Sequence, residues 1–412
     1  MNYISFNRNS IYVLNNVKDK IIITNDKGQW IKMSKEVYNI FCEAELMKYT
    51  INDILTLCSE PEDKVFLKKL YDDLTDLDIL KSKDAVSNDF IKVGIEITNK
   101  CNLQCKHCCF SAKSISDNDD SDLSTADFLV VIDNIISLEH VTAIQLSGGE
   151  PMTRKDFFYI LSYLREKFNG TIILSTNGTL INNNNVKMIT DMVDVVDMSI
   201  DGVNEESCSQ IRGIGVFQKV INSIELLKKN GFENIDLSMI FSEKNEHMKT
   251  HFRDLCSNLE VNPIERIFSP VGRGIENVDL FKINKNEYYI PEEYGHEDIS
   301  KITSRACGAA KNQFFIKNNA NVYPCPSFVK EESKLGNLLE VKLDSIYRNK
   351  KIDIIKLLEE HKLYKKNSCN ICDFESFCWT CPGEVFEINS MALFKDRCDK
   401  NKKILEKYLQ GV

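Results

Sequence analysis

Cys101-Asn-Leu-Gln-Cys105-Lys-His-Cys108 places three thiols on one short stretch of a 412-residue chain. Three thiolates can hold three irons of a [4Fe-4S] cube and leave the fourth iron without a protein ligand. A small molecule can bind to that iron, and an amino acid can chelate it through its amine and carboxylate. The alternative is a zinc ion whose fourth ligand lies elsewhere in the sequence, such as His107 or Cys109.

Strand-like runs alternate with amphipathic helical stretches from Phe90 to about Pro270. The predicted strands cover residues 91–97, 143–146, 171–175, 195–200, 235–240 and 264–268, and the predicted helices about 125–139, 154–168, 183–192, 217–230 and 246–258. Repeated β-α units predict a parallel sheet with its chemistry at the carboxyl ends of the strands. The three cysteines follow the first strand directly, where a parallel barrel keeps its active site.

A second motif, Ser147-Gly148-Gly149-Glu150-Pro151, ends the second predicted strand. Paired glycines let a backbone approach a ligand closely, and the carboxylate of Glu150 can accept a hydrogen bond from an ammonium group. The motif closes the second βα loop, so we expect it to face the three cysteines.

With both motifs at strand ends, residues 90–270 resemble the radical S-adenosylmethionine (SAM) superfamily. The resemblance implies a [4Fe-4S] cluster, whose open iron chelates SAM, on three ligands: Cys101, Cys105 and Cys108. Reduction of the bound SAM then releases a 5′-deoxyadenosyl radical that takes a hydrogen from the substrate. The SAM amine would lie against the second motif, at Gly148, Gly149 and Glu150. His107 fills the usual aromatic position, whereas Cys109 stands where the family often has an aromatic residue and is a spectator or a reactive thiol.

Four other residues near strand ends are further SAM contacts by the same resemblance: Ser175, Asn177, Asp201 and Arg212. Ser175 and Asn177 end the third predicted strand and would bind the ribose or the carboxylate of SAM. Asp201 ends the fourth strand, and Arg212 would pair with the SAM carboxylate. The alternatives are an Asn-Gly turn, an Asx turn and a surface arginine.

Seven more cysteines stand in the last quarter of the chain: Cys307, Cys325, Cys369, Cys372, Cys378, Cys381 and Cys398. CxxC pairs also occur in zinc ribbons, so one or two zinc sites are the alternative to iron-sulfur clusters. The spacing resembles the SPASM extension of radical SAM peptide maturases, over residues 300–405. Ala320 replaces the usual glycine, and only two residues separate Cys378 from Cys381.

The resemblance to SPASM domains implies two auxiliary [4Fe-4S] clusters. The first would use Cys307, Cys325 and Cys381, and the second Cys369, Cys372, Cys378 and Cys398. Seven cysteines leave one iron of the first auxiliary cluster without a cysteine ligand from this pattern. Either a cysteine from elsewhere completes that cluster, or a substrate thiolate binds there, and we favour the open site because none of the remaining cysteines lies in the tail.

Residues 1–85 begin with short β-rich runs separated by turn residues and continue with apolar residues at helical spacing. This winged-helix-like β+α order resembles the RiPP recognition element, which binds the leader of ribosomally made, modified peptides as an added strand. The alternative is a dimerisation or structural domain. The polar stretch 81–89 is the predicted linker to the barrel.

The composition limits the classes of protein that the chain can belong to. The chain has fifteen cysteines, six of them in three CxxC pairs, and this clustering indicates metal binding in a reducing compartment. The N-terminus lacks a signal-peptide pattern and no long apolar run occurs, so we expect a cytoplasmic protein without membrane association. The net charge of −9 argues against nucleic-acid binding.

Together these patterns predict an α/β fold: a partial (β/α)6 radical SAM barrel between an N-terminal recognition element and a C-terminal SPASM extension. The predicted reaction removes a hydrogen from a precursor peptide, which carries a leader and is rich in cysteine, and forms a thioether between that carbon and a cysteine sulfur. A reductant such as flavodoxin or ferredoxin would supply electrons. Carbon-carbon crosslinking, another peptide oxidation, and a non-catalytic iron-sulfur electron carrier are the rival hypotheses. The sequence does not identify catalytic residues other than the cofactor ligands.

Overall fold

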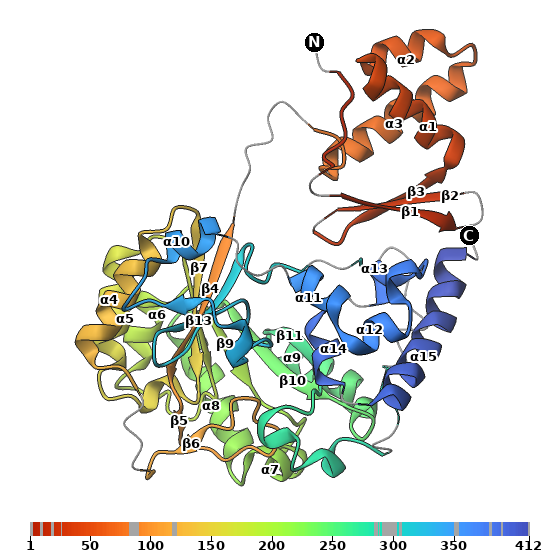
Figure 1. The fold of residues 1–412 in the computed structure, drawn as a ribbon. Coiled ribbons are helices and arrows are strands. Elements are labelled where there is room, and N and C mark those ends of the chain that lie inside the picture. Colours follow the sequence, from red (N-terminus) through yellow and green to blue (C-terminus); the bar gives the residue numbers. More distant parts are fainter. Residues whose placement is uncertain are drawn as a thin grey trace. The chain divides into compact units, whose positions relative to one another are not determined.

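The computed structural model describes residues 3–8, 11–17, 20–25, 27–81, 90–117, 122–283, 287, 289–290, 303–304, 307–349, 354–378, 381–388 and 390–410. The chain folds into two compact units, each made from segments that are separate in sequence (Figure 1). The first unit combines Met1–Asn88, Glu292–Cys307 and Ile354–Val412, and the second combines Asp89–Pro291 and Gly308–Asp353. This grouping differs from the three consecutive segments predicted from the sequence. Residues 82–89 of the predicted linker lie outside the described residues.

The second unit is built on a nine-stranded sheet of order β11-β10-β9-β8-β7-β4-β12-β13-β14. The first six strands in this order are parallel to their neighbours and are the predicted barrel strands: β4 (Ile91–Thr98), β7 (Val141–Gly148), β8 (Thr171–Thr176), β9 (Val195–Ser199), β10 (Ile235–Phe241) and β11 (Asn262–Ile267). The partial (β/α)6 barrel is therefore confirmed.

Helices cover one face of this sheet because each carries an apolar stripe that needs burial. They are α4 (Thr125–Ile136), α5 (Phe157–Lys167), α6 (Val186–Met192), α7 (Glu205–Arg212), α8 (Val216–Lys229) and α9 (Lys249–Leu259), and only α7 was not predicted. Apolar side chains from these helices share one continuous core with alternate strand residues, as Phe128 and Leu161 do with Ile95 and Leu174. Caps set the helix starts: Ser124 accepts a hydrogen bond from Asp127 N at the start of α4.

Three strands from the predicted tail continue the barrel sheet. β12 (Gln313–Ile316) pairs in parallel with β4, and β13 (Asn321–Tyr323) and β14 (Gly336–Asn337) follow in antiparallel pairing. Helix α10 (Leu343–Asn349) ends this part. A separate two-stranded ribbon joins β5 (Lys100–Cys101) to β6 (Lys113–Ser114). Because β12 pairs with β4, the strand that leads into the three-cysteine loop lies beside residues from the start of the cysteine-rich tail.

The first unit begins with strands and continues with helices, in the predicted order. The strands β1 (Ile11–Val17), β2 (Lys20–Asn25) and β3 (Trp30–Ser34) form an antiparallel sheet, and α1 (Lys35–Met47), α2 (Ile51–Leu57) and α3 (Pro61–Asp76) pack on it. Phe41, Ile54 and Leu74 are buried in their shared core. A capping box between Thr50 and Asp53 starts α2.

The C-terminal helices belong to the same unit as this N-terminal module. They are α11 (Ile354–Glu360), α12 (Lys362–Lys366), α13 (Glu375–Cys378), α14 (Gly383–Glu387) and α15 (Met391–Gln410). Ile22, Phe374, Phe377 and Leu405 form one buried cluster, and Trp30 packs edge-on against Phe377 with ring centroids 5.5 Å apart. No helix in the described ranges has both the length and the apolar character that crossing a bilayer requires.

Candidate functional site

The three-cysteine loop follows β4 at the carboxyl edge of the parallel strands, as predicted. The side chains of Cys101 and Cys105 are buried, and that of Cys108 is half-buried. Burial raises the pKa of the Cys101 thiol to about 11, and the neighbouring Glu150, Cys105 and Cys108 raise it further. Thiols that perturb one another lie close together, so the loop brings all three sulfurs to one place.

Hydrogen-bond donors point at each of these sulfurs. Leu103 N lies 3.3 Å from Cys101 Sγ, Ala112 N lies 3.4 Å from Cys108 Sγ, and Arg212 Nη1 lies 3.9 Å from Cys105 Sγ. Donors to sulfur stabilise the thiolate form that iron requires and tune the potential of a cluster. The donor set therefore fits a [4Fe-4S] cluster on three cysteines.

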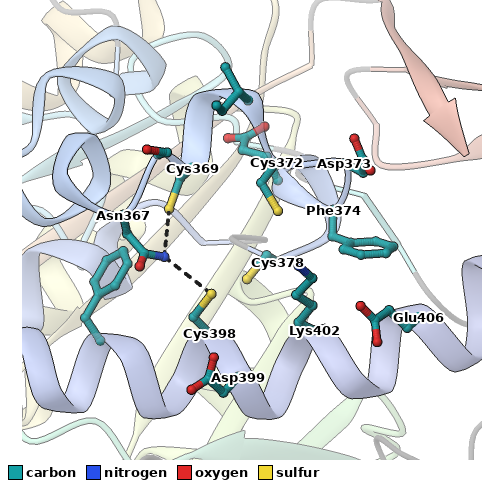
Figure 2. A pocket seen from close by; sticks show the side chains of 14 residues that line it. Asn367, Cys369, Cys372, Asp373, Phe374, Cys378, Cys398, Asp399, Lys402 and Glu406 are labelled. Carbon is teal, nitrogen blue, oxygen red and sulfur yellow. Dashed lines mark hydrogen bonds between the residues drawn. The ribbon is translucent and has the colours of Figure 1, made fainter.

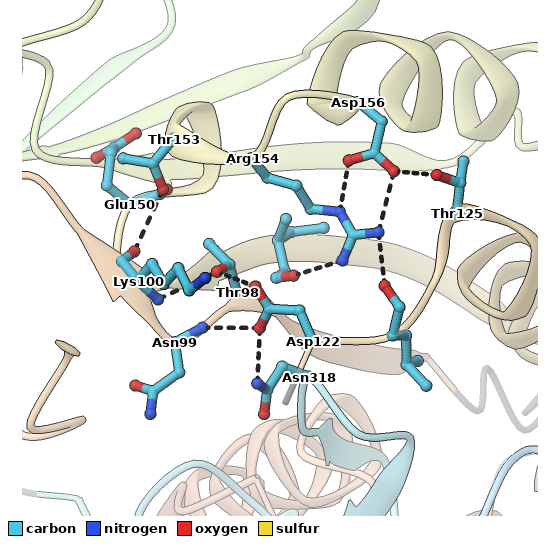
Figure 3. A network of polar contacts seen from close by, with 12 residues as sticks. Thr98, Asn99, Lys100, Asp122, Thr125, Glu150, Thr153, Arg154, Asp156 and Asn318 are labelled. Carbon is cyan, nitrogen blue, oxygen red and sulfur yellow. Dashed lines mark hydrogen bonds and ion pairs between the residues drawn. The ribbon is translucent and has the colours of Figure 1, made fainter. Parts of the chain in front are cut away.

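A polar network centred on Asp122 holds the start of this loop (Figure 3). Asp122 Oδ2 accepts a hydrogen bond from Thr98 Oγ1 at 2.5 Å, and its Oδ1 accepts from Asn99 N at 3.3 Å and from Asn318 Nδ2 at 2.7 Å. Asn318 follows β12, and its carbonyl accepts from Leu123 N at 3.0 Å. One carboxylate thus joins the end of β4 to the turn after β12. Sequence reasoning missed both residues.

We expect Asp122→Ala to loosen the cysteine loop. The change leaves the donors of Thr98 and Asn318 without their acceptor, a loss of about 1–3 kcal/mol of local stability. Amide hydrogen exchange at residues 98–101 should then accelerate by about tenfold or more in the cluster-free protein. Asp133→Ala is the control, because Asp133 is half-exposed on α4 and pairs with Lys167. Equal exchange in the two variants would show that the network does not hold the loop.

The glycines of the second motif are needed for close backbone contact with the cysteine loop. A Cβ atom on Gly148 would lie 2.4 Å from Thr98 O, and one on Gly149 would lie 2.2 Å from Lys100 O. Gly149 N and Glu150 N donate hydrogen bonds of 2.8 Å to Thr98 O and Lys100 O. Both positions therefore require glycine because their backbone packs against the cysteine loop. The reason predicted from the sequence was close approach to a ligand.

Glu150 is fully buried and joins the ends of β7 and β8. Its carboxylate accepts hydrogen bonds from Thr176 Oγ1 at 2.8 and 2.9 Å and from Asn177 N at 2.7 Å. Burial raises the pKa of Glu150 to about 7, although these hydrogen bonds oppose the rise. Asn177 Nδ2 lies 3.8 Å from Cys101 Sγ, so two of the predicted SAM contacts adjoin the cysteine loop.

The raised pKa of Glu150 predicts a pH dependence of stability. A carboxyl group with a raised pKa in the folded state stabilises the fold while protonated, and this contribution is lost as pH rises from about 4.5 to about 7. We expect Glu150→Gln to remove a change of roughly 3 kcal/mol across that range. Urea unfolding of the cluster-free proteins at several pH values measures how the free energy of unfolding depends on pH. The same pH dependence in wild type and Glu150→Gln would contradict the prediction.

Asp201, His107 and Arg212 form a buried charged group beside Cys105. Asp201 Oδ2 lies 2.5 Å from Arg212 Nη2 and 2.9 Å from His107 Nε2, and Asp201 Oδ1 accepts from Ile240 N at 2.8 Å. Burial by itself would raise the pKa of Asp201, but Arg212 and then His107 outweigh it, so that its pKa is lowered. His107 Nδ1 is buried and has no hydrogen-bond partner in the described part of the chain.

Ser175 differs from the other predicted SAM contacts. Its hydroxyl accepts a hydrogen bond from Gln145 Nε2 at 2.7 Å and lies 3.3 Å from Asp197 Oδ2, so it points along the sheet and not at the cysteine loop. Sequence reasoning also missed Arg273, whose Nη1 donates to Cys105 O at 2.9 Å and whose backbone N donates to Cys108 O at 2.9 Å. The Gly-Arg-Gly run at residues 272–274 was the available signal.

A second group of cysteines lines a cavity of about 430 Å³ in the first unit (Figure 2). Its sulfurs come from Cys369, Cys372, Cys378 and Cys398, the four predicted ligands of the second auxiliary cluster. Asn367 Nδ2 lies 3.4 Å from Cys398 Sγ, and Arg397 Nη1 lies 3.3 Å from Cys378 Sγ. Burial raises the pKa of the Cys378 thiol, and Arg397 opposes that rise.

The four thiols surround the cavity and do not meet at one point. Within the described ranges, no three His, Cys, Asp or Glu side chains are arranged to hold a single metal ion. A zinc ion would need its sulfur ligands within about 2.3 Å of one centre. Four thiols around one cavity, with hydrogen-bond donors to their sulfurs, fit the predicted [4Fe-4S] cluster.

The remaining tail cysteines are divided between the two units. Cys307 is half-buried and Cys381 is exposed, and both lie in the first unit. Cys325 lies in the second unit, just after β13. Two of the three predicted ligands of the first auxiliary cluster thus belong to the same unit.

Comparison with family models identifies two regions of the chain. Residues 95–255 match the radical SAM superfamily, and residues 307–373 match the SPASM iron-sulfur cluster-binding domain. The first match contains the three-cysteine loop, and the second contains Cys307, Cys325, Cys369 and Cys372.

Among curated proteins, the mycofactocin maturase MftC of Mycobacterium tuberculosis is 27% identical over 265 residues, which cover 59% of this chain and 66% of MftC. The chain therefore spans just under two thirds of that relative's length. The AdoMet-dependent heme synthase of Methanosarcina barkeri is 27% identical over 347 residues, 73% of this chain and 94% of the synthase.

Solved structures share the fold at lower identity. The structure of anSMEcpe with bound AdoMet superposes with a TM-score of 0.55 at 19% identity, over 76% of this chain and 96% of that one. Streptococcus suis SuiB bound to the precursor peptide SuiA superposes with a TM-score of 0.55 at 15% identity, over 94% of this chain and 98% of SuiB.

Proposed function

Because this chain carries a radical SAM domain and an iron-sulfur cluster-binding SPASM domain, we propose that it is an enzyme that modifies a ribosomally made precursor peptide. The observation that carries the proposal is the three-thiol loop at the carboxyl edge of the barrel, in a chain that holds a second, four-thiol cavity. The finer proposal is that the modification is a thioether crosslink between a cysteine sulfur and a carbon of the peptide.

SAM bound at a [4Fe-4S] cluster supplies, on reduction, the 5′-deoxyadenosyl radical that takes hydrogen from a substrate. In the proposal, Cys101, Cys105 and Cys108 hold that cluster. Arg212 and Ala112 N supply hydrogen bonds to its thiolates. The buried carboxylates of Glu150 and Asp201 fix the loops after β8 and β9, so that the SAM site keeps its shape.

In the tail, we assign the second auxiliary cluster to the four thiols that line the cavity. The first auxiliary cluster would use Cys307, Cys325 and Cys381 and would keep one iron for the thiolate of a substrate cysteine. A sulfur bound to iron would be deprotonated, so it could bond to the carbon radical that remains after hydrogen abstraction. The auxiliary cluster would accept the one electron that this bond formation releases. Electrons would arrive from a flavodoxin or ferredoxin.

The N-terminal module would bind the leader of the precursor. Its three-stranded sheet has the order β1-β2-β3, so β1 and β3 are the edge strands at which a peptide could add by backbone pairing. Two relatives support a peptide partner: MftC is named a maturase, and SuiB was solved with its precursor peptide SuiA. The packing of Trp30 on Phe377 joins this module to the cysteine-rich tail.

The first test is anaerobic reconstitution followed by reduction with dithionite. Three four-iron clusters predict about twelve irons per chain and a broad absorbance near 400 nm. The proposal requires formation of 5′-deoxyadenosine from SAM. An electron carrier would form none, and a zinc protein would bind zinc in place of iron.

The second test concerns the peptide. We expect a short cysteine-rich peptide encoded beside this gene, when co-expressed with the enzyme, to lose two hydrogens per crosslink in its mass. Fragmentation that places the lost hydrogens on a cysteine and a second residue supports the thioether. A carbon-carbon link with free thiols would replace that chemistry, and an unchanged peptide mass with active enzyme would exclude that peptide as the substrate.

A further inference from the structure

The two faces of the barrel sheet differ in what covers them. On β9, Val196 and Met198 belong to the core that the helices bury, so Asp197 between them points to the opposite face. On that opposite face, side chains of the neighbouring strands are half-buried, including Gln145 and Ser175. The side chains on this face are therefore less completely covered than those that the helices bury on the other face.

A row of polar side chains crosses this face over four strands. Gln145 on β7 donates to Ser175 on β8 at 2.7 Å, and Ser175 Oγ lies 3.3 Å from Asp197 Oδ2 on β9. From β11, Arg266 Nη2 reaches the same oxygen at 2.9 Å. The row lies two residues before Asn177 on β8 and four before Asp201 on β9, so it runs deeper along the strands than these two predicted SAM contacts.

The other carboxylate oxygen of Asp197 is the unusual atom of this row. Asp197 is only 8% exposed, and its Oδ1 has no hydrogen-bond partner in the part of the chain that the structure describes. A buried acceptor without a donor is unfavourable, by about 1–3 kcal/mol. Burial also raises the pKa of Asp197, in keeping with an incompletely solvated carboxylate. The arrangement would be stabilised by a ligand that brings a donor to Oδ1.

Arg266 places hydrogen-bond donors next to the Asp197 carboxylate. The side chain of Arg266 is 50% exposed, so part of its guanidinium is available beyond its bond to Asp197. The Asp236 carboxylate, in register with Asp197 on β10, adds a negative charge to this face. The Asp197–Arg266 pair itself carries one negative and one positive charge. It offers one acceptor and one donor, which is the complement of a peptide unit with its N–H and C=O.

We propose that the row Gln145–Ser175–Asp197–Arg266 binds the backbone of the substrate peptide, with Asp197 Oδ1 accepting a peptide N–H and Arg266 donating to a peptide carbonyl. The inference rests on the proposed function and adds to it the residues that position the peptide within the barrel. Recognition of backbone groups fixes the position of the peptide and leaves the identity of the modified side chain to other contacts.

The test compares Asp197→Asn and Arg266→Gln with wild type in the reconstituted holoenzyme. The probe is a synthetic cysteine-rich precursor peptide that the wild-type enzyme modifies in the co-expression test above. Each variant loses one charge-assisted hydrogen bond to the peptide, so we expect KM for the peptide to rise about tenfold or more, and to rise by a larger factor than kcat falls. Arg266→Lys keeps the charge and should recover part of the loss.

Arg253→Gln is the matched control. Arg253 is also a half-exposed arginine paired with an acidic partner, but its partner Glu265 precedes Arg266 on β11 and faces the helices. We expect its KM to equal that of wild type. An unchanged KM for the peptide in Asp197→Asn and Arg266→Gln would overturn the inference, whether or not these variants bind SAM more weakly. If the holoenzyme forms no 5′-deoxyadenosine from SAM, the proposed function fails and the inference fails with it.

Discussion

Alanine at Cys105 is expected to abolish 5′-deoxyadenosine formation and to lower the iron content from about twelve to about eight per chain, the sum for two remaining four-iron clusters. Cys105 is buried in the three-cysteine loop, and Arg212 Nη1 lies 3.9 Å from its sulfur. Two cysteines cannot hold the cluster in place of three, and without that cluster SAM has no electron source. The loss of 5′-deoxyadenosine formation should therefore be complete.

Alanine at Cys381 is expected to have a different result. Cys381 lies with Cys307 in the first unit, whereas the three-cysteine loop belongs to the second unit. The variant should lose iron and peptide modification but keep at least part of its SAM cleavage. Retention of SAM cleavage separates the role of the first auxiliary cluster from that of the SAM cluster.

Both variants can be compared by iron analysis, electron paramagnetic resonance of the reduced protein, and chromatography of 5′-deoxyadenosine. Cys109→Ala is the control for the loop, because Cys109 adjoins Cys108 but is not a proposed ligand; it should keep all three clusters. If Cys381→Ala lost SAM cleavage as completely as Cys105→Ala, the proposed division of labour between the clusters would be wrong. Loss of a cluster in Cys109→Ala would make Cys109 more than a spectator.

The barrel could be predicted from the sequence because each of its elements is specified locally. Alternation of apolar runs and amphipathic stretches sets the order of strands and helices, and the six parallel strands β4, β7, β8, β9, β10 and β11 lie within a few residues of their predicted positions. Helix α7 was missed since it is short and polar, with its buried contact limited to Cys208. The parallel pairing of β12 with β4 was missed because it joins residues more than two hundred positions apart.

The cysteine ligands could also be predicted, because spacing along the chain carries that information. The residues that hold these ligands in place could not be predicted from the sequence. Asp122 and Asn318 meet only through the pairing of β12 with β4, and neither belongs to a recognisable motif. Gly148 and Gly149 were predicted from their motif, but their steric role against Thr98 and Lys100 required coordinates. Local patterns thus identified the atoms that hold the cofactors, whereas tertiary contacts identified the residues that hold those atoms.

Arg212→Met is expected to destabilise the cluster-free protein by about 3–5 kcal/mol, because it leaves the charge of Asp201 buried without its main partner. The side chains of Arg212 and Asp201 are 8% and 4% exposed, and Arg212 Nε and Nη2 lie 2.6 and 2.5 Å from Asp201 Oδ2. Arg212→Lys keeps the charge but not the two-pronged contact, so its loss should be smaller. The double variant Arg212→Met/Asp201→Asn should recover part of the stability, since the unpaired charge is gone.

Urea unfolding measures these differences, and Lys187→Met supplies the comparison. Lys187 and Asp191 form an ion pair with side chains 72% and 53% exposed, so its removal should cost less than about 1 kcal/mol.

The lowered pKa of Asp201 adds a second measurement, the pH dependence of the free energy of unfolding. A carboxylate with a lowered pKa stabilises the fold above its unfolded pKa and loses that contribution as pH falls. The gap between wild type and Arg212→Met should therefore narrow in acid. A gap as small as that of Lys187→Met, or one independent of pH, would mean that solvent or His107 compensates Asp201 and that Arg212 does not stabilise the loop after β9.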